Sequence, residues 1–208
     1  MSTIGLRRFL QRPPPPAPGE QCEMCAEPIV ADHGHVIDLG NRSILCTCRG
    51  CYLLFTHTGA GGGRHRAVPE RYLHVADFPA GSQLWEATGI PVRMAFMFHN
   101  SSLESTVAFY PSPAGATESL LPQRAWDDIL AGSPTLGDIQ DDVEALLVNR
   151  VAHEDFECFL VPIDACYGLV GLVRLYWKGF DGGTEAWEHI DSFFADLRER
   201  SEPVTADG

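Results

Sequence analysis

The feature that most constrains this chain is a pair of Cys-x-x-Cys motifs close to its N-terminus. The first is Cys22-Glu-Met-Cys25, the second is Cys48-Arg-Gly-Cys51, and 22 residues separate them. Each motif can form a tight turn that brings two thiolates to one ion, and two such turns complete a tetrahedron. The expected ligands of a single metal ion are therefore Cys22, Cys25, Cys48 and Cys51.

The segment between the two motifs predicts a β-hairpin. It contains HVIDLGNRSIL, in which β-forming residues flank a Gly40-Asn41 turn. Two cysteine turns on a hairpin are typical of a zinc-ribbon-like module. A module of about 40 residues buries little core, so a bound metal is the expected source of its stability.

Zinc is the first choice of metal, because four thiolates in a closed tetrahedron are typical of structural zinc. Iron is the alternative, either as a rubredoxin-like single ion or as an iron–sulfur cluster that uses the run Cys46-x-Cys48-x-x-Cys51. Rubredoxin-like turns usually place Gly after each motif. Here Ala26 and Tyr52 follow instead, which favours zinc.

Three further residues are candidate ligands. If the chain around Cys46 and Cys48 is extended, both side chains point to one face, so either could be the third thiolate. We favour Cys48 because it completes a Cys-x-x-Cys turn. His33 and His35 form a His-x-His pair and are candidates for substitute ligands or for a second site.

Charge and cysteine usage restrict the partners and the compartment. The formal net charge of −13 disfavours nucleic acid and anionic membranes, which demand a basic surface. No run approaches the roughly 20 apolar residues of a membrane span, and the N-terminus lacks the pattern of a secretory signal. Five of the seven cysteines lie between residues 22 and 51, which in a reducing compartment indicates metal binding. We therefore expect a cytoplasmic protein.

Changes in composition divide the chain into five parts. The predicted parts are an N-terminal segment with a Pro-rich spacer (1–20), the metal module (21–58), a Gly-rich joint (59–63), an α+β domain (64–200) and a C-terminal tail (201–208).

Hydrophobic patterns in the fourth part predict an α+β sandwich. The expected strands include Val92–His99, Thr106–Tyr110, Cys158–Ile163 and Leu169–Trp177, and the expected helices include Gln123–Leu130, Asp138–Val148 and Thr184–Arg200. The fold class is thus α+β, with a small zinc-ribbon-like hairpin module ahead of the sandwich.

The α+β part shows no catalytic signature such as G-x-S-x-G, H-E-x-x-H or a phosphate-binding loop. Two segments, PSPAGATES at 111–119 and DACYG at 164–168, are interpreted as loops that contact a partner. The candidate contact residues are Pro113, Gly115, Thr117, Glu118, Asp164 and Tyr167. The alternative contact is the exposed edge of the hairpin around His33 to Asn41, because an unpaired edge accepts another strand.

Several longer motifs, among them HGHVIDLGNRSILCTCRGCYLLF, YPSPAGATES and VPIDACYGLVGLVRLYWKGFDGG, occur together along nearly the whole chain. In these motifs the chain resembles an uncharacterised actinobacterial family, a domain of unknown function. Members of that family are often encoded near nickel–iron hydrogenase genes and their maturation factors. The resemblance implies an accessory or assembly role, with a hydrogenase subunit or maturation factor as the partner.

Two functions lead as hypotheses, and an enzyme that uses the loops of the α+β part is a third. The first is a non-catalytic, zinc-stabilised accessory or protein-interaction protein. The alternative is an electron-transfer or metallocentre-assembly protein that holds iron at the same thiolates.

Overall fold

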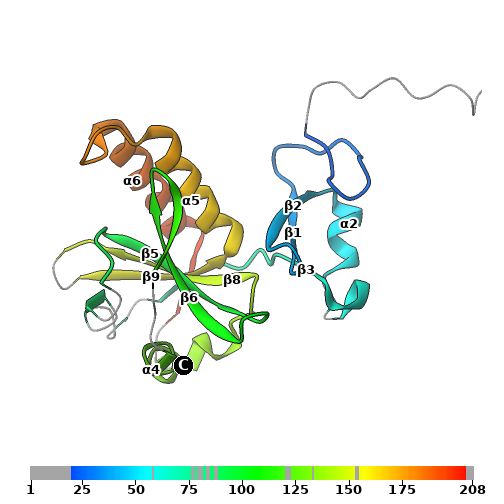
Figure 1. Ribbon diagram of the computed structural model, residues 1–208, viewed down its shortest axis with the longest axis horizontal. Helices are drawn as coiled ribbons and strands as arrows, with labels where there is room; N and C mark the ends of the chain where they lie inside the picture. Colours follow the sequence, from blue (N-terminus) through cyan, green and yellow to red (C-terminus); the bar gives the residue numbers. More distant parts are fainter. Residues whose placement is uncertain are drawn as a thin grey trace, which may run out of the picture.

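The computed structural model has an α+β fold, in which a small cysteine-bearing module precedes a sheet-rich domain (Figure 1), and this confirms the predicted fold class. The structure describes residues 20–57, 59–75, 78, 82, 85–86, 89–119, 123–132, 134–152 and 155–204. The predicted Pro-rich spacer and residues 205–208 of the predicted C-terminal tail lie outside these residues, whereas residues 202–204 of that tail form a strand.

The metal module, defined here as residues 21–67, is built on a three-stranded antiparallel sheet in the order β2-β1-β3. Its elements are β1 (Gly34–Asp38), β2 (Ser43–Thr47), α2 (Arg49–Leu54), the 3₁₀ helix η1 (Ala60–Gly63) and β3 (His65–Ala67). The predicted hairpin is β1–β2. Asp38 closes its turn, since its carboxylate accepts the N–H groups of Gly40 and Asn41 at 2.9 and 3.3 Å.

The Gly-rich segment 59–63 returns the chain to the same sheet. Gly61 and Gly62 adopt left-handed φ values of 60° and 74°, which glycine accepts without steric cost. The strand that follows, β3, pairs with β1. Residues 65–67, which the sequence assigned to the second domain, therefore extend the sheet of the module.

The sheet domain, residues 68–204, contains a seven-stranded sheet in the order β10-β4-β9-β8-β5-β6-β7. Its strands are β4 (Leu73–Val75), β5 (Met94–Asn100), β6 (Ser105–Ser112), β7 (Gly115–Ser119), β8 (Glu144–Arg150), β9 (Phe156–Pro162) and β10 (Glu202–Val204). Its helices are α4 (Gln123–Gly132), the 3₁₀ helix η2 (Pro134–Asp138), α5 (Ile163–Tyr176) and α6 (Gly183–Arg200). Neighbouring strands are antiparallel except for β10 and β4.

Helices cover both faces of this sheet, which creates two hydrophobic cores (Figure 1). Side chains alternate along each strand, so Phe96 packs with α5 and α6 while its neighbour Met97 packs with Trp126 of α4. Phe159 of β9 and Phe194 of α6 belong to the core on the α5 and α6 side and are almost fully buried. The sheet is thus covered by apolar packing on both faces.

Two predicted elements were wrong. The second half of the predicted helix Asp138–Val148 is strand β8, whose residues Glu144–Asn149 are all buried, and a turn at 141–143 precedes it. A strand covered on both faces has no polar alternation, so its apolar run resembles a buried helix. The predicted strand Leu169–Trp177 belongs to helix α5, whose buried residues follow a helical spacing.

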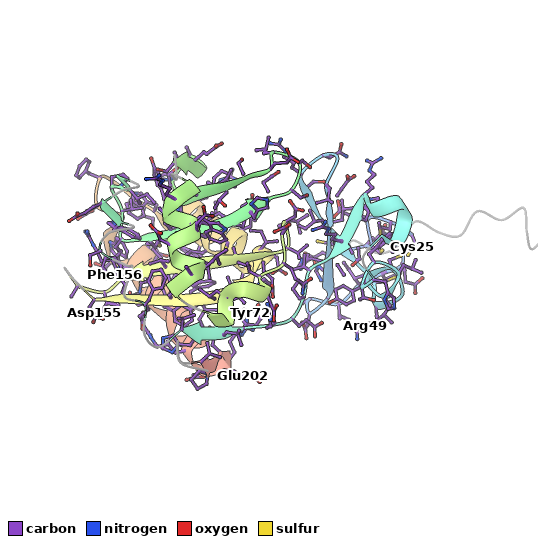
Figure 2. All side chains as sticks on the ribbon, turned by 90° about the horizontal axis from the view of Figure 1, so that it is seen from below. Cys25, Arg49, Tyr72, Asp155, Phe156 and Glu202 are labelled. Carbon is purple, nitrogen blue, oxygen red and sulfur yellow. The ribbon has the colours of Figure 1, made fainter. Side chains whose placement is uncertain are left out.

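The module contacts the sheet domain through apolar and charged groups. Ile37 of β1 joins the core that α5 and α6 cover. Arg66 of β3 donates to the backbone carbonyl of Asp141 at 3.1 Å and pairs with the carboxylate of Asp142 at 3.2 Å. Figure 2 shows the module, which carries Cys25, at the opposite end of the molecule from Asp155.

Within the part of the chain that the structure describes, no helix combines the length and the apolar character that crossing a bilayer requires.

Candidate metal centre

The first cysteine turn is held by backbone hydrogen bonds. The Ala26 N–H donates to the Cys22 carbonyl at 2.8 Å, and the Cys22 N–H donates to the Glu27 carbonyl at 2.8 Å. Ala26 has a left-handed φ of 61°, the conformation for which such turns normally use Gly. The Glu23 N–H donates to the carbonyl of Cys46 at 2.9 Å, so the turn is attached to the end of β2.

The second cysteine turn is the beginning of helix α2. Cys48 is the N-cap residue, and its sulfur accepts the N–H of Cys51 at 3.5 Å. The spacing of three residues places both thiols on one face of the helix start. The two turns thus approach each other from opposite sides of one end of the hairpin.

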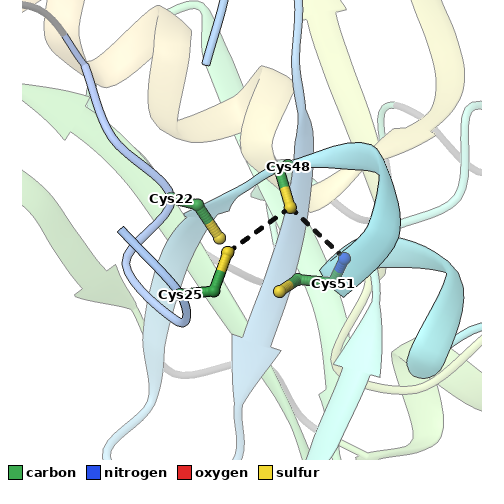
Figure 3. Close-up of side chains that lie close together, drawn as sticks. All are labelled: Cys22, Cys25, Cys48 and Cys51. Carbon is green, nitrogen blue, oxygen red and sulfur yellow. Dashed lines mark hydrogen bonds between the residues drawn. The ribbon is translucent and has the colours of Figure 1, made fainter. Parts of the chain in front are cut away.

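The four predicted sulfurs converge on one point (Figure 3). The sulfurs of Cys22, Cys25, Cys48 and Cys51 all lie within 4.8 Å of one another, and none forms a disulfide. The distance from the Cys25 sulfur to the Cys48 sulfur is 3.7 Å. Tetrahedral bonds of about 2.3 Å would place sulfurs about 3.8 Å apart, so the cluster has the size of a four-thiolate site.

The electrostatics of the cluster favour a bound cation. Burial opposes ionisation of Cys22, but the N–H groups of Cys48, Met24 and Cys25 outweigh it and lower the pKa of Cys22 to about 6. Burial, reinforced by the neighbouring thiols, raises the pKa of Cys51 to about 12. Cys22 is thus easily ionised whereas Cys51 is not, and a bound divalent ion would favour the thiolate form of both.

Cys46 lies in a second group, apart from these four thiols. It pairs with His35 across the β1–β2 ladder, and Cys46, His33 and His35 each place a ligand atom within 4.8 Å of the other two. Cys48, and not Cys46, is the residue that the structure brings together with Cys22, Cys25 and Cys51.

The six predicted partner-contact residues fall in three places, and neither segment is a loop. PSPAGATES is the end of β6, a tight turn that contains Pro113, and edge strand β7, which carries Gly115, Thr117 and Glu118. DACYG is the first part of helix α5.

Glu118 and Tyr167 face a groove between the module and the sheet domain. This junction groove, a cavity of about 100 Å³, is bordered by Ile37 and Ile44 of the module and by Phe109 of β6. Asp164 instead points toward the module's histidines, since its carboxylate lies 2.6 Å from His35 Nδ1. The local sequence carries no signal for this contact, which joins residues 129 positions apart.

The other two cysteines are deeply buried in the sheet domain. Cys158 on β9 and Cys166 on α5 expose 0% of their surface, and burial raises the pKa of both thiols. A neutral thiol without access to solvent is a poor nucleophile. These two residues pack as small apolar side chains.

No curated protein and no solved structure matches the chain. A model of a family of unknown function, DUF5947, matches residues 21–201, a span that contains the four clustered thiols and every described strand except β10. The chain therefore belongs to the DUF5947 family.

Proposed function

We propose that this protein is a zinc-stabilised accessory protein that acts in the cytoplasm by binding another protein and not by catalysis. The observation that carries the proposal is the convergence of four thiols from two cysteine turns within 4.8 Å. Four protein ligands fill a tetrahedron and leave no position for a substrate, which is the arrangement of structural zinc sites.

The small core of the module explains why it needs the metal. Among the described residues 21–67, Val36, Ile37, Cys22 and Tyr52 are the buried apolar side chains. The metal would tie the segment before β1 to the start of α2 and so hold the hairpin in place. Such a site contributes directly to folding free energy.

The junction groove is the surface that we assign to the partner. Its borders combine apolar side chains with Glu118 and with Tyr167, which is 40% exposed. Strand β7 beside it is an edge strand of the sheet, so one side of its backbone is open to pairing with another chain. The net charge of −13 favours a partner with a basic surface.

The resemblance to a family encoded near hydrogenase genes supports a particular partner. We propose a subunit of a nickel–iron hydrogenase or one of its maturation factors.

Iron at the same four thiolates is the second candidate, in which the chain transfers electrons or assists metallocentre assembly. Thiolates hold zinc and iron alike, so the donor set leaves this alternative open. Metal analysis with a visible absorption spectrum separates the two. Protein with zinc is colourless, whereas ferric thiolate is red.

The experiment is affinity purification of the tagged protein at native expression in the organism that encodes it. We expect wild-type protein to retain a hydrogenase component and Cys48→Ser to lose it together with the metal. Tyr167→Ala should weaken retention while metal content stays unchanged. Phe180→Ala is the matched control, because Phe180 is fully exposed but lies outside the groove.

Two results contradict the proposal. If wild-type protein purifies alone and turnover of a small molecule accompanies it, the protein is an enzyme. If Phe180→Ala and not Tyr167→Ala releases the partner, the groove is the wrong surface.

A further inference from the structure

The module contains a second cluster of ligand-type side chains, distinct from the four thiols. His33 directly precedes β1, His35 lies in β1, and Cys46 lies in β2, the strand paired with it. Each offers a ligand atom within 4.8 Å of the other two, and the two imidazole centroids are 4.9 Å apart. Two imidazoles and one thiol so close together form a donor set for a borderline-soft transition metal.

Both histidines use Nδ1 for a hydrogen bond, which leaves Nε2 of each ring for a metal ion. Nδ1 of His33 lies 2.8 Å from the carbonyl of Val30, and Nδ1 of His35 lies 2.6 Å from the carboxylate of Asp164. A carbonyl and a carboxylate accept hydrogen bonds, so Nδ1 of each ring carries the proton. Nε2 of each ring is then left with a free lone pair. Metal-binding histidines are typically oriented by such a bond from the other nitrogen.

His33 Nε2 has no other explanation in the structure. The His33 side chain is 9% exposed, and Nε2 is a buried atom for which the described residues supply no hydrogen-bond partner. Buried polar atoms are nearly always paired, so an unpaired one calls for a bound ion or water. A metal ion suits this position, because an imidazole nitrogen beside a thiol can donate its lone pair to it.

The surrounding charge is also suited to a cation. The Glu23 carboxylate accepts the N–H of Cys46 at 2.6 Å, and a carboxylate oxygen of Glu20 lies 3.8 Å from His33 Nδ1. Together with Asp164 these are three carboxylates around the cluster. His33 and His35 also border a cavity of about 720 Å³, so the cluster can be reached from solvent.

We propose that His33, His35 and Cys46 form a second, exchangeable binding site for a divalent transition metal of the zinc class, with its fourth position open to the cavity. Three protein ligands leave one tetrahedral position for water or for an exogenous ligand, which structural sites do not have. Asp164 of α5 is a positioning residue that couples this site to the sheet domain through His35. The site is independent of the four-thiol cluster and of the partner proposed above.

Cobalt is the probe for this site, because cobalt bound to thiolate absorbs visible light whereas zinc is silent. Protein is first saturated with zinc and dialysed, which leaves the four-thiol site filled. Co²⁺ is then titrated in, and bound metal is counted by elemental analysis. We expect one Co²⁺ per chain in addition to the retained zinc, with a charge-transfer band from a single thiolate.

Four variants assign the site. Cys46→Ser should abolish the charge-transfer band, and His33→Gln and His35→Gln should each lower cobalt affinity by at least tenfold while the zinc is retained. Asp164→Asn should weaken affinity about 10- to 100-fold with the ligands in place. His57→Gln is the matched control, because His57 is an exposed histidine of the same module outside the cluster.

Retained zinc and an unchanged circular dichroism spectrum show that a variant is folded. The proposal is wrong if zinc-loaded protein binds no Co²⁺. It is also wrong if Co²⁺ binds with equal affinity to the wild type and to both histidine variants.

Discussion

Arg71 is predicted to hold the connection between β3 and β4 against the central strand β8, and Arg71→Met tests how much stability this contact supplies. Its guanidinium donates to both carboxylate oxygens of Glu144, at 2.9 and 2.8 Å, and also to the carbonyl of Asp138 at 3.2 Å. Arg71 lies in the short connection between β3 and β4, while Glu144 begins the central strand β8. The Glu144 side chain is 0% exposed.

The expected loss follows from the burial of the partner that remains. Removing one member of a buried ion pair typically costs about 3–5 kcal/mol, because the other charge stays buried and unpaired. The Arg71 side chain is 35% exposed, and solvent therefore screens part of the pair. We take the lower end, about 3 kcal/mol, which corresponds to a fall of about 6–12 °C in Tm for a chain of this size.

The assay is thermal unfolding followed by circular dichroism at pH 7, with zinc at the same excess in every sample so that metal binding does not change the comparison. Arg198→Met is the matched control. Arg198 makes the same two-pronged contact with Glu157, at 2.5 and 2.7 Å, but is 44% exposed. We expect the control to lose about 1 kcal/mol or less.

A double variant, Arg71→Met with Glu144→Met, should regain most of the lost stability because the unpaired charge is gone. If Arg71→Met is no less stable than Arg198→Met, the Glu144 carboxylate is not buried as the structure shows it, and the reasoning fails.

Two further predictions concern the hairpin of the metal module. The Arg64 guanidinium, against opposing burial and with help from the N–H groups of Asn41 and Gly40, lowers the pKa of Asp38 from 3.8 to about 2. This stabilisation is complete above about pH 4 and is lost as the pH falls toward 2. The Tm difference between wild type and Arg64→Met should therefore shrink over that range. A Tm difference that grows in acid would contradict the prediction. Gly34→Ala should lower Tm, because the new Cβ would lie 2.6 Å from a ring carbon of buried Tyr52 and overpacking costs about 1–3 kcal/mol. Gly50→Ala is its control, since the nearest atom to that Cβ is 3.9 Å away, and equal losses in the two variants would count against the clash.

The sequence was most informative where local spacing alone determines geometry. Two Cys-x-x-Cys turns around a hairpin were sufficient to predict that Cys22, Cys25, Cys48 and Cys51 converge, and the last helix was evident from its apolar period. The neighbouring strands β5 and β6 were recognisable because they are short apolar runs on either side of a polar turn.

The sequence was least informative where tertiary environment overrides local pattern. Strand β8 is buried on both faces, so its apolar run matched a helix as well as a strand. Helix α5 is rich in β-branched and aromatic residues that usually favour strands, yet it covers the sheet.

Contacts between distant segments were also hidden from the sequence. The bond between His35 and Asp164 joins the module to α5, and neither neighbourhood predicts it. The left-handed backbone at Ala26 was also not predictable, because this conformation is usually found at Gly and the sequence has Ala there.

The most direct test of the account is the metal content of the purified protein, combined with X-ray absorption at the zinc edge. After dialysis against metal-free buffer, we expect about one zinc per chain with four sulfur neighbours at about 2.3 Å. Cys48→Ser should fall well below one zinc, because it removes one of the four converging thiols. Metal-free protein from zinc-replete cells, iron in place of zinc, or a full zinc content in Cys48→Ser would contradict the account.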